Sequence, residues 1–210
     1  MPGLFLTFEG GEGSGKSPQI ERLAARLRRL GYDPVVTREP GGTPLGEGAR
    51  ALLLDHAHRP EPQTEVFLLE AARTELVARV IRPALAAGRV VVCDRYDDST
   101  LAYQGGGRGL DADTLLRLNQ FATGGLKPEL TFLFDLDPAV GLARRAGAGD
   151  ANRLDLEPQA FHARVRERYL EMARREPGRF VVLAAGAPPD ELEARIAAAV
   201  ESRLGAAPAP

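Results

Sequence analysis

The sequence has little cysteine, little excess charge and no long apolar run. Its 210 residues include one cysteine, so no disulfide framework is possible, as is usual in a reducing compartment. The formal net charge is −2, without the basic excess of a nucleic-acid-binding protein. No apolar run approaches the roughly 20 residues that cross a bilayer, and the N-terminus does not resemble a signal peptide. We expect a cytoplasmic protein that binds neither nucleic acid nor membrane.

Spacing typical of a metal site made by histidine is also missing. His56, His58 and His162 are not spaced with cysteine or carboxylate residues as zinc ligands usually are. We expect His56 and His58 to be exposed loop residues and His162 to lie on a helix surface. The single cysteine, Cys93, follows three valines, and we expect it to be a small buried core residue.

Apolar runs typical of strands alternate with segments of helical periodicity along the chain. The expected strands span residues 4–9, 34–39, 89–95, 130–136 and 179–185. The expected helices span residues 20–31, 45–54, 64–88, 111–123, 158–176 and 188–204, and another begins at residue 138. Pro83 is expected to kink the 64–88 helix or to begin a separate last turn. This alternation predicts an α/β fold with a mainly parallel sheet.

Neither a repeat nor a long linker divides the chain. Its length, with 44% apolar and 27% charged residues, suits one globular unit with one sizeable core. We therefore expect a single domain over residues 1–210. Within it, the small residues at 146–152 indicate a mobile loop, and the tail at 205–210 is expected to fray.

The stretch GGEGSGKSPQ, residues 10–19, carries a phosphate-binding motif. It matches GxxxxGK[ST] and lies between an expected strand and an expected helix, which is the context that the motif requires. Backbone N–H groups of such a loop surround a phosphate, and the helix N-terminus adds a partial positive charge. The motif predicts that a nucleoside triphosphate contacts Gly10, Gly11, Glu12, Gly13, Ser14, Gly15, Lys16, Ser17 and Pro18.

Within and near this loop, three residues have expected roles in binding phosphate and Mg²⁺. Lys16 would reach the β- and γ-phosphates, and Ser17 would ligate Mg²⁺. Asp94, at the end of the 89–95 strand, is expected to be the acidic partner for Mg²⁺. Pro18 is unusual because it has no N–H. We expect the first helical turn to tolerate it, but we also expect it to disfavour α geometry at Ser17 and to weaken ATP binding.

Several arginines, together with one absent motif, indicate what the nucleotide is used for. The guanine-recognition motif NKxD is absent, which argues against a GTPase switch. Transfer of a phosphoryl group between two anionic nucleotides requires cations that clamp and neutralise the transferred group. Arginines lie near expected strand ends or loops at Arg38, Arg50, Arg73, Arg95, Arg144, Arg145 and Arg153.

Segments along most of the chain resemble the thymidylate kinases. The resemblance rests on TREPGGTPLGEGAR (37–50), LEAAR (69–73), DRYDDSTLAYQGGGRGL (94–110), LFDLDPAVGLARR (133–145) and NRLDLEP (152–158). It implies a three-layer P-loop NTPase fold, with a parallel sheet of about five strands flanked by helices. It also implies transfer of the ATP γ-phosphoryl to dTMP, with Mg²⁺ as cofactor, by a homodimer to which the 64–88 helix contributes.

Roles at the dTMP site follow from the same resemblance. Arg73 and Arg95 would hold the phosphate and the base, and Arg50 would lie near the phosphate. The other residues implied to contact dTMP are Glu12 near the sugar, Arg38 and Glu39 along the cleft, Leu69 at a position that usually carries a stacking phenylalanine, Thr100 and Gln104 at the thymine edge, and Tyr103 against the deoxyribose.

Catalytic roles are implied for Lys16 and for several arginines. Position 13 is glycine, so the chain resembles the members whose catalytic arginine lies in a lid, near residues 144–156, rather than in the phosphate loop. The implied catalytic residues are Lys16, Arg95, Arg144, Arg145 and Arg153.

Two other functions remain open from the sequence. Pro18, Leu69 and the arginine-poor lid, in which Asp155 replaces the usual glutamate, depart from the family pattern. The chain is therefore either a dTMP kinase, another nucleoside monophosphate or deoxynucleoside kinase, or a catalytically weakened nucleotide-binding relative.

Overall fold

The computed structural model describes residues 3–148 and 152–205, and its centre is a five-stranded sheet. The strands are β1 (Leu4–Gly10), β2 (Val35–Arg38), β3 (Val90–Asp94), β4 (Leu130–Asp135) and β5 (Phe180–Ala184). They pair in the order β2-β3-β1-β4-β5, and every pair is parallel. The prediction of a parallel sheet of about five strands flanked by helices is confirmed.

Helices occupy most of the chain between the strands. The α-helices are α1 (Lys16–Arg29), α2 (Pro44–Leu54), α3 (Pro62–Leu76), α4 (Arg82–Ala86), α5 (Asp97–Thr100), α6 (Ala112–Thr123), α7 (Pro138–Ala148), α8 (Gln159–Arg175) and α9 (Pro189–Gly205). Two π-helical segments, η1 (Val77–Ile81) and η2 (Leu101–Gly107), and one 3₁₀ turn, η3 (Arg153–Leu156), complete the set. None of the described helices is long and apolar enough to cross a membrane.

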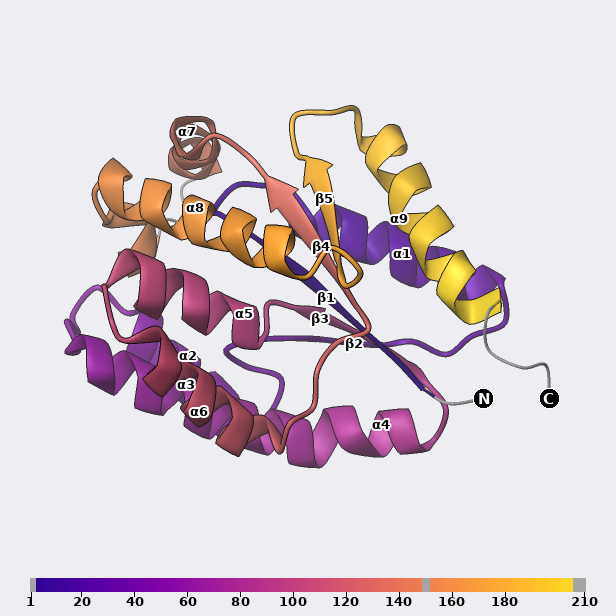
Figure 1. The fold of residues 1–210 in the computed structure, drawn as a ribbon, viewed down its shortest axis with the longest axis horizontal. Helices are drawn as coiled ribbons and strands as arrows, with labels where there is room; N and C mark the ends of the chain where they lie inside the picture. The colour runs from indigo at the N-terminus through magenta and orange to yellow at the C-terminus, as the bar shows by residue number, and fades with distance from the viewer. Residues whose placement is uncertain (1–2, 149–151, 206–210) are drawn as a thin grey trace.

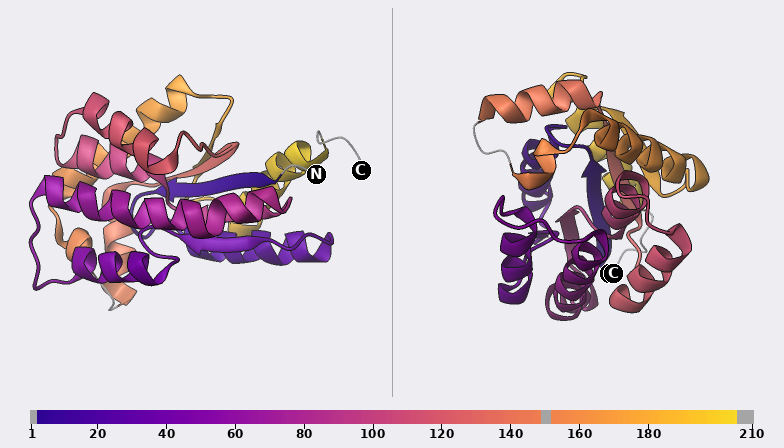
Figure 2. Two further views of the ribbon diagram at one scale, coloured as in Figure 1. Left: turned by 90° about the horizontal axis from the view of Figure 1, so that it is seen from below. Right: turned by 90° about the vertical axis from the view of Figure 1, so that its left-hand side faces the viewer.

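The helices cover both faces of the sheet and make a three-layer structure (Figures 1 and 2). Successive side chains of a strand point to opposite faces, so Leu6 and Phe8 of β1 face one layer and Phe5 faces the other. Leu6 and Phe8 pack with apolar residues of α1 and α9. Phe5 packs with residues of α3, η1 and α4. β1 is buried along its whole length, as expected for a central parallel strand.

The expected 64–88 helix is divided into α3, η1 and α4. Pro83 lies in the first turn of α4, so it begins a separate last turn, which is one of the two outcomes expected for it. Proline has no N–H, and its ring clashes with the carbonyl four residues earlier in a regular α-helix. The wider π turn of η1 directly precedes this point.

The segment from Asp97 to Gly107 is helical, although no helix was expected there. Three glycines at 105–107 disfavour a helix in isolation. Packing against α8 explains the difference, because a Cβ on Gly107 would lie 2.4 Å from Phe161 and one on Gly106 would lie 2.8 Å from Arg168. These glycines permit a close approach to α8, and the approach places the 101–107 segment beside the site.

Part of the expected 146–152 loop is also helical. α7 continues to Ala148, so the expectation of a loop is wrong for residues 146–148. Residues 149–151 of that loop and of the expected lid, and residues 206–210 of the expected tail, lie outside the described residues. Gly205 is the last residue of α9.

Candidate active site

The phosphate-binding loop leaves the sheet beside Asp94 and Arg95. β1 ends at Gly10, where the loop begins, and β3 ends at Asp94. The two strands are parallel, with Phe8 opposite Asp94, so both segments leave the same edge of the sheet. Ligands of open parallel sheets bind at this carboxyl edge.

Lys16 is held in the hollow of the loop. Gly15, with φ of 84°, is the N-cap of α1 in the left-handed conformation that glycine adopts readily. The Lys16 ammonium is buried and lies 3.3 Å from each of three oxygens, the Gly10 and Gly11 carbonyls and Ser14 Oγ. Burial, and secondarily the charge of Arg95, lower the pKa of Lys16. These long contacts leave the ammonium available to a phosphate group in the loop.

The loop is in backbone contact with α7. Gly13 has φ of 63°, and a Cβ on it would lie 2.2 Å from the carbonyl oxygen of Gly141. A Cβ on Gly141 would in turn lie 2.2 Å from the carbonyl oxygen of Glu12. No side chain fits at either glycine in this arrangement, because real Cβ atoms do not approach backbone atoms so closely.

Ser17 and Pro18 are the second and third residues of α1, and both are exposed. We expected Pro18 to disfavour α geometry at Ser17, and Ser17 is nevertheless α-helical. Pro18 costs no helical hydrogen bond here, because the first N–H groups of a helix have no intrahelical partner. Its effect on ATP binding remains a prediction.

Ser17 and Asp94 line one cavity, of about 460 Å³, together with Thr37 and Arg38. Within the described residues, the buried Asp94 Oδ1 and Thr37 Oγ1 have no hydrogen-bond partner. No group of three or more metal-binding side chains occurs in residues 3–148 and 152–205. Mg²⁺ is typically bound by one or two protein oxygens, waters and substrate phosphates, so these residues fit Mg²⁺.

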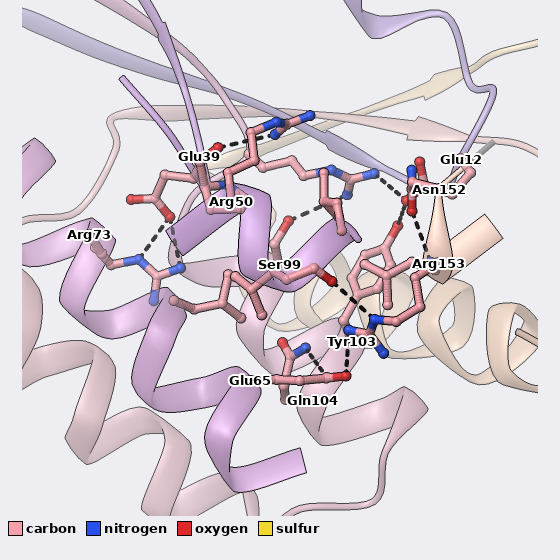
Figure 3. A pocket seen from close by; sticks show the side chains of 16 residues that line it. Glu12, Glu39, Arg50, Glu65, Arg73, Ser99, Tyr103, Gln104, Asn152 and Arg153 are labelled. Atoms are coloured by element: carbon pink, nitrogen blue, oxygen red, sulfur yellow. Dashed lines mark hydrogen bonds and ion pairs between the residues drawn. The ribbon is translucent and has the colours of Figure 1, made fainter. Parts of the chain in front are cut away.

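A second cavity, of about 110 Å³, adjoins the loop (Figure 3). Many residues predicted to contact dTMP line it: Glu12, Glu39, Arg50, Leu69, Arg73, Arg95, Tyr103 and Gln104. Arg153, predicted as a lid arginine, lines it too. Two predicted residues do not, since Arg38 lines the Asp94 cavity and Thr100 is buried behind Arg73.

A hydrogen-bonded group lies between the loop and the second cavity and consists of Arg95, Glu12 and Tyr103. Arg95 Nη2 donates to Glu12 Oε1 at 2.9 Å, and the Tyr103 hydroxyl donates to the same oxygen at 2.7 Å. Burial alone would raise the pKa of Glu12, but Arg95, Lys16 and Tyr103 outweigh it and lower that pKa to about 2. Arg95 has φ of 69°, which costs energy for a residue other than glycine.

The Arg73 guanidinium is fully buried and makes hydrogen bonds through each of its nitrogens. It donates to Glu39, Glu70, Asn119, Thr100 and the Tyr96 carbonyl, at 2.6 to 3.3 Å. A guanidinium has five N–H groups, so these five bonds to described residues use all of them. Arg73 therefore holds α3 to the 96–100 segment and to α6, and a bound ligand must displace one of these bonds to accept from it.

The three candidate lid arginines lie in different environments. Arg144 is exposed and donates to the Gly13 carbonyl at 3.3 Å. Arg145 pairs with Asp155 at 3.2 Å. Arg153 is buried and donates to the Leu53 carbonyl at 3.0 Å and to Glu65 at 2.8 Å. The contact of Arg144 is thus with the phosphate loop.

Glu65 and His162 are among the residues near the site whose placement the sequence analysis missed. Glu65 lines the second cavity, and its place on one helical face with Leu69 and Arg73, at spacings of four, was a usable signal. His162 is buried, so its expected surface position is wrong. It packs edge-on against Phe161 and faces a small cavity beside Glu12, which only the tertiary structure reveals. His56 and His58 are exposed and Cys93 is buried, as expected.

The fold and the site together define a P-loop kinase. A phosphate-binding loop with a buried lysine adjoins a cavity lined by arginines, and Glu12 belongs to both. Such an arrangement suits transfer of a phosphoryl group between two anionic substrates.

Similarity to known proteins identifies the family to which this chain belongs. A family model described as Thymidylate kinase matches residues 8–196. Thymidylate kinases of Deinococcus radiodurans and Ectopseudomonas mendocina are 54% and 50% identical, over 96% and 98% of this chain and 98% and 99% of their own. A crystal structure of thymidylate kinase from Ehrlichia chaffeensis is 32% identical, with a TM-score of 0.78, over 95% of this chain and 99% of that one. The chain belongs to the thymidylate kinase family.

Proposed function

We propose that the chain transfers the γ-phosphoryl of ATP to dTMP, giving dTDP and ADP. The observation that carries this proposal is the hydrogen-bonded group of Glu12, Arg95 and Tyr103. This group joins the phosphate loop to the second cavity, which we propose holds dTMP and call the acceptor cavity. Both substrates are anionic, and the site offers buried cations on both sides of that group, Lys16 and Arg73.

The residues present suggest direct transfer. Lys16 neutralises the β- and γ-phosphates, and Arg95 orients the acceptor phosphate toward them. Ser17 and Asp94 would hold Mg²⁺, which supplies further charge neutralisation on the phosphates when bound. The acceptor phosphate is already anionic at neutral pH, so the reaction needs neither a general base nor a covalent intermediate. Arg144, at the Gly13 carbonyl, is the candidate to approach the transferred group from the lid side.

A coupled assay of ADP release tests the proposal and separates it from the two alternatives. With ATP and Mg²⁺ present, ADP release should depend on dTMP and exceed that with CMP, UMP or AMP. Preference for one of the other nucleotides would point to a different nucleotide kinase. ATP binding without dTMP-dependent turnover would point to a weakened relative.

Replacing Pro18 should tighten ATP binding. Pro18→Thr restores an N–H in the first turn of α1, where the loop faces the nucleotide phosphates. One hydrogen bond to a charged group contributes about 1.5–3 kcal/mol, so we expect the Kd for ATP to fall by roughly 10- to 100-fold. Titration calorimetry measures this, with Pro18→Ala as a second donor-restoring variant. An unchanged or weaker affinity in both variants would contradict it.

We further propose that a second copy of this chain covers the face formed by α3 and α6. These helices pack together, and they leave Phe67 64% exposed and Phe121 89% exposed. Exposed aromatic residues of this size are typical of a contact surface. We also propose a cytoplasmic location, because a chain with a single cysteine forms no intrachain disulfide and suits a reducing compartment.

A charge on this face should weaken the dimer. Phe121→Glu places a carboxylate in a face that would be buried, and we expect the dissociation constant to rise at least about 10-fold. Light scattering after gel filtration over a concentration series measures the change. Leu30→Glu, at a 51% exposed apolar residue after α1, is the matched control and should remain dimeric. A wild-type chain that is monomeric throughout would contradict the proposal.

A further inference from the structure

Glu65 is a buried carboxylate for which the proposed chemistry supplies no role. It lies in the first turn of α3 and is 1% exposed. Gln104 of η2 donates to it through Nε2 at 3.0 Å, and Arg153 of η3 donates through Nη2 at 2.8 Å, as Figure 3 shows. Arg108, which directly follows η2, donates through Nε at 3.2 Å and Nη2 at 3.0 Å. Three separate segments therefore meet at one side chain.

The carboxylate of Glu65 is fixed by these bonds. Oε1 accepts from Arg108 and Arg153, and Oε2 accepts from Gln104 and Arg108. A carboxylate has about four acceptor positions, so all of them are in use. The two guanidinium charges balance Glu65 and Glu157, which pairs with Arg108 at 2.7 Å. Rotation of the Glu65 side chain would break several charge-assisted bonds at once.

This fixed carboxylate determines which way the Gln104 amide points. An ionised carboxylate only accepts hydrogen bonds, so the group of Gln104 that faces it must be the NH₂. The carbonyl Oε1 of Gln104 then points elsewhere. It is buried and has no partner among the described residues, while Gln104 lines the acceptor cavity. A buried acceptor left unpaired is costly, so a base N–H that enters the cavity beside Gln104 gains by pairing with this oxygen.

We propose that Glu65 is a positioning residue that selects the acceptor base by holding Gln104 with its carbonyl toward the cavity. The proposal rests on the proposed function and extends it to base selection. Thymine and uracil carry an N–H at ring position 3, between two carbonyls, and can donate to Gln104 Oε1. Cytosine has a bare, hydrogen-bond-accepting nitrogen at this position, which would face another acceptor. Glu65 thus favours pyrimidines that carry the ring N–H.

Glu65→Gln tests this directly, because an amide at position 65 can face Gln104 with either its oxygen or its NH₂. Steady-state kinetics with dTMP, dUMP and dCMP give the selectivity. We expect kcat/KM for dTMP and dUMP to fall by about 10-fold or more, mainly through KM, as loss of one buried hydrogen bond predicts. The value for dCMP should fall less, so the dTMP-to-dCMP ratio should drop by about 10-fold while the dTMP-to-dUMP ratio stays the same.

Arg108→Gln is the matched control. It removes two bonds to Glu65 and one ion pair, but it leaves the Glu65–Gln104 bond in place. A general loosening of the site would therefore lower the dTMP-to-dCMP ratio in both variants, and that result would overturn the proposal. A ratio that drops in Glu65→Gln and persists in Arg108→Gln would support it.

Two further measurements keep the proposal testable if Glu65→Gln does not fold. Glu65→Asp keeps the charge for both arginines but withdraws the carboxylate from Gln104, and it should lower the same ratio. In the wild-type enzyme, dTMP methylated at ring position 3 should lose about 10-fold or more in affinity relative to dTMP. An unchanged ratio in Glu65→Asp, or equal affinity for the methylated nucleotide, would overturn the proposal. Absence of any dTMP-dependent turnover in the wild type would instead refute the proposed function.

Discussion

Replacement of Lys16 by methionine should lower kcat by about 100- to 1000-fold, as removal of one preorganised electrostatic donor typically does. Lys16 is the buried cation of the phosphate loop, within 3.3 Å of three loop oxygens. Methionine has a similar length and no charge, so the stem would still fill the loop. The negative charge that develops on the transferred phosphoryl group would then lose its fixed partner. Steady-state kinetics at saturating ATP and dTMP measure the effect.

The same substitution should not destabilise the fold. Burial lowers the pKa of Lys16, which means that the folded protein disfavours the charged ammonium relative to water. Methionine removes that unfavourable burial, so we expect the melting temperature to stay the same or rise. Arg28→Met, at an exposed residue of α1, is the control and should change neither kcat nor melting temperature. A Lys16→Met enzyme within tenfold of the wild-type kcat would contradict the assigned role.

Replacement of Arg95 by methionine should lower kcat/KM for dTMP by about 100- to 1000-fold, within the range measured for lost oxyanion-type contacts. Arg95 reaches Gly10 of the loop at 2.9 Å and Glu12 at 2.9 Å, so its loss removes the cation that we propose lies between the two substrates. Arg95→Lys keeps a charge without the fork of a guanidinium, and it should recover part of the loss. Equal values for the wild type and Arg95→Met would exclude Arg95 from the reaction.

Arg95→Met should also destabilise the fold in a pH-dependent way. Arg95 and Lys16 lower the pKa of Glu12 from 4.5 to about 2, and a lowered carboxyl pKa contributes stability that is present above pH 4.5. This contribution is lost as pH falls toward 2. The variant lacks most of this contribution. The free energy of unfolding of the wild type should therefore exceed that of the variant by on the order of 2–3 kcal/mol at pH 7, and this difference should shrink between pH 4.5 and 2. Urea unfolding across this pH range measures it; a constant difference would contradict it.

The parts of the fold that could be predicted from the sequence are those set by local pattern. Buried parallel strands are nearly all apolar, as in VVVCD (90–94), and the glycine-rich loop between a strand and a helix has a specific chemical signature. Both were found at nearly the observed boundaries. The family motifs then placed most of the acceptor cavity, because Arg73, Arg95, Tyr103 and Gln104 belong to recognisable segments.

The features that could not be predicted depend on distant segments. The π-helical η2 forms with its glycines against Phe161 and Arg168 of α8, and the three glycines at 105–107 would disfavour a helix in isolation. His162 is buried by segments from elsewhere in the chain, so the expectation of a surface position, which rested on its polar side chain, was wrong. The role of Glu65 depends on Gln104 and Arg153, which are 39 and 88 residues away.

The contact between Gly13 and Gly141 restricts how this enzyme can evolve. The family resemblance implies a catalytic arginine either in the phosphate loop, at position 13, or in the lid. Here a single atom added to Gly13 would collide with the backbone of α7. A mutation to arginine at this position would therefore be deleterious unless α7 had already moved, and a displaced α7 would carry Arg144 away from the loop. No single substitution at position 13 of this chain would therefore move the catalytic arginine from the lid to the phosphate loop.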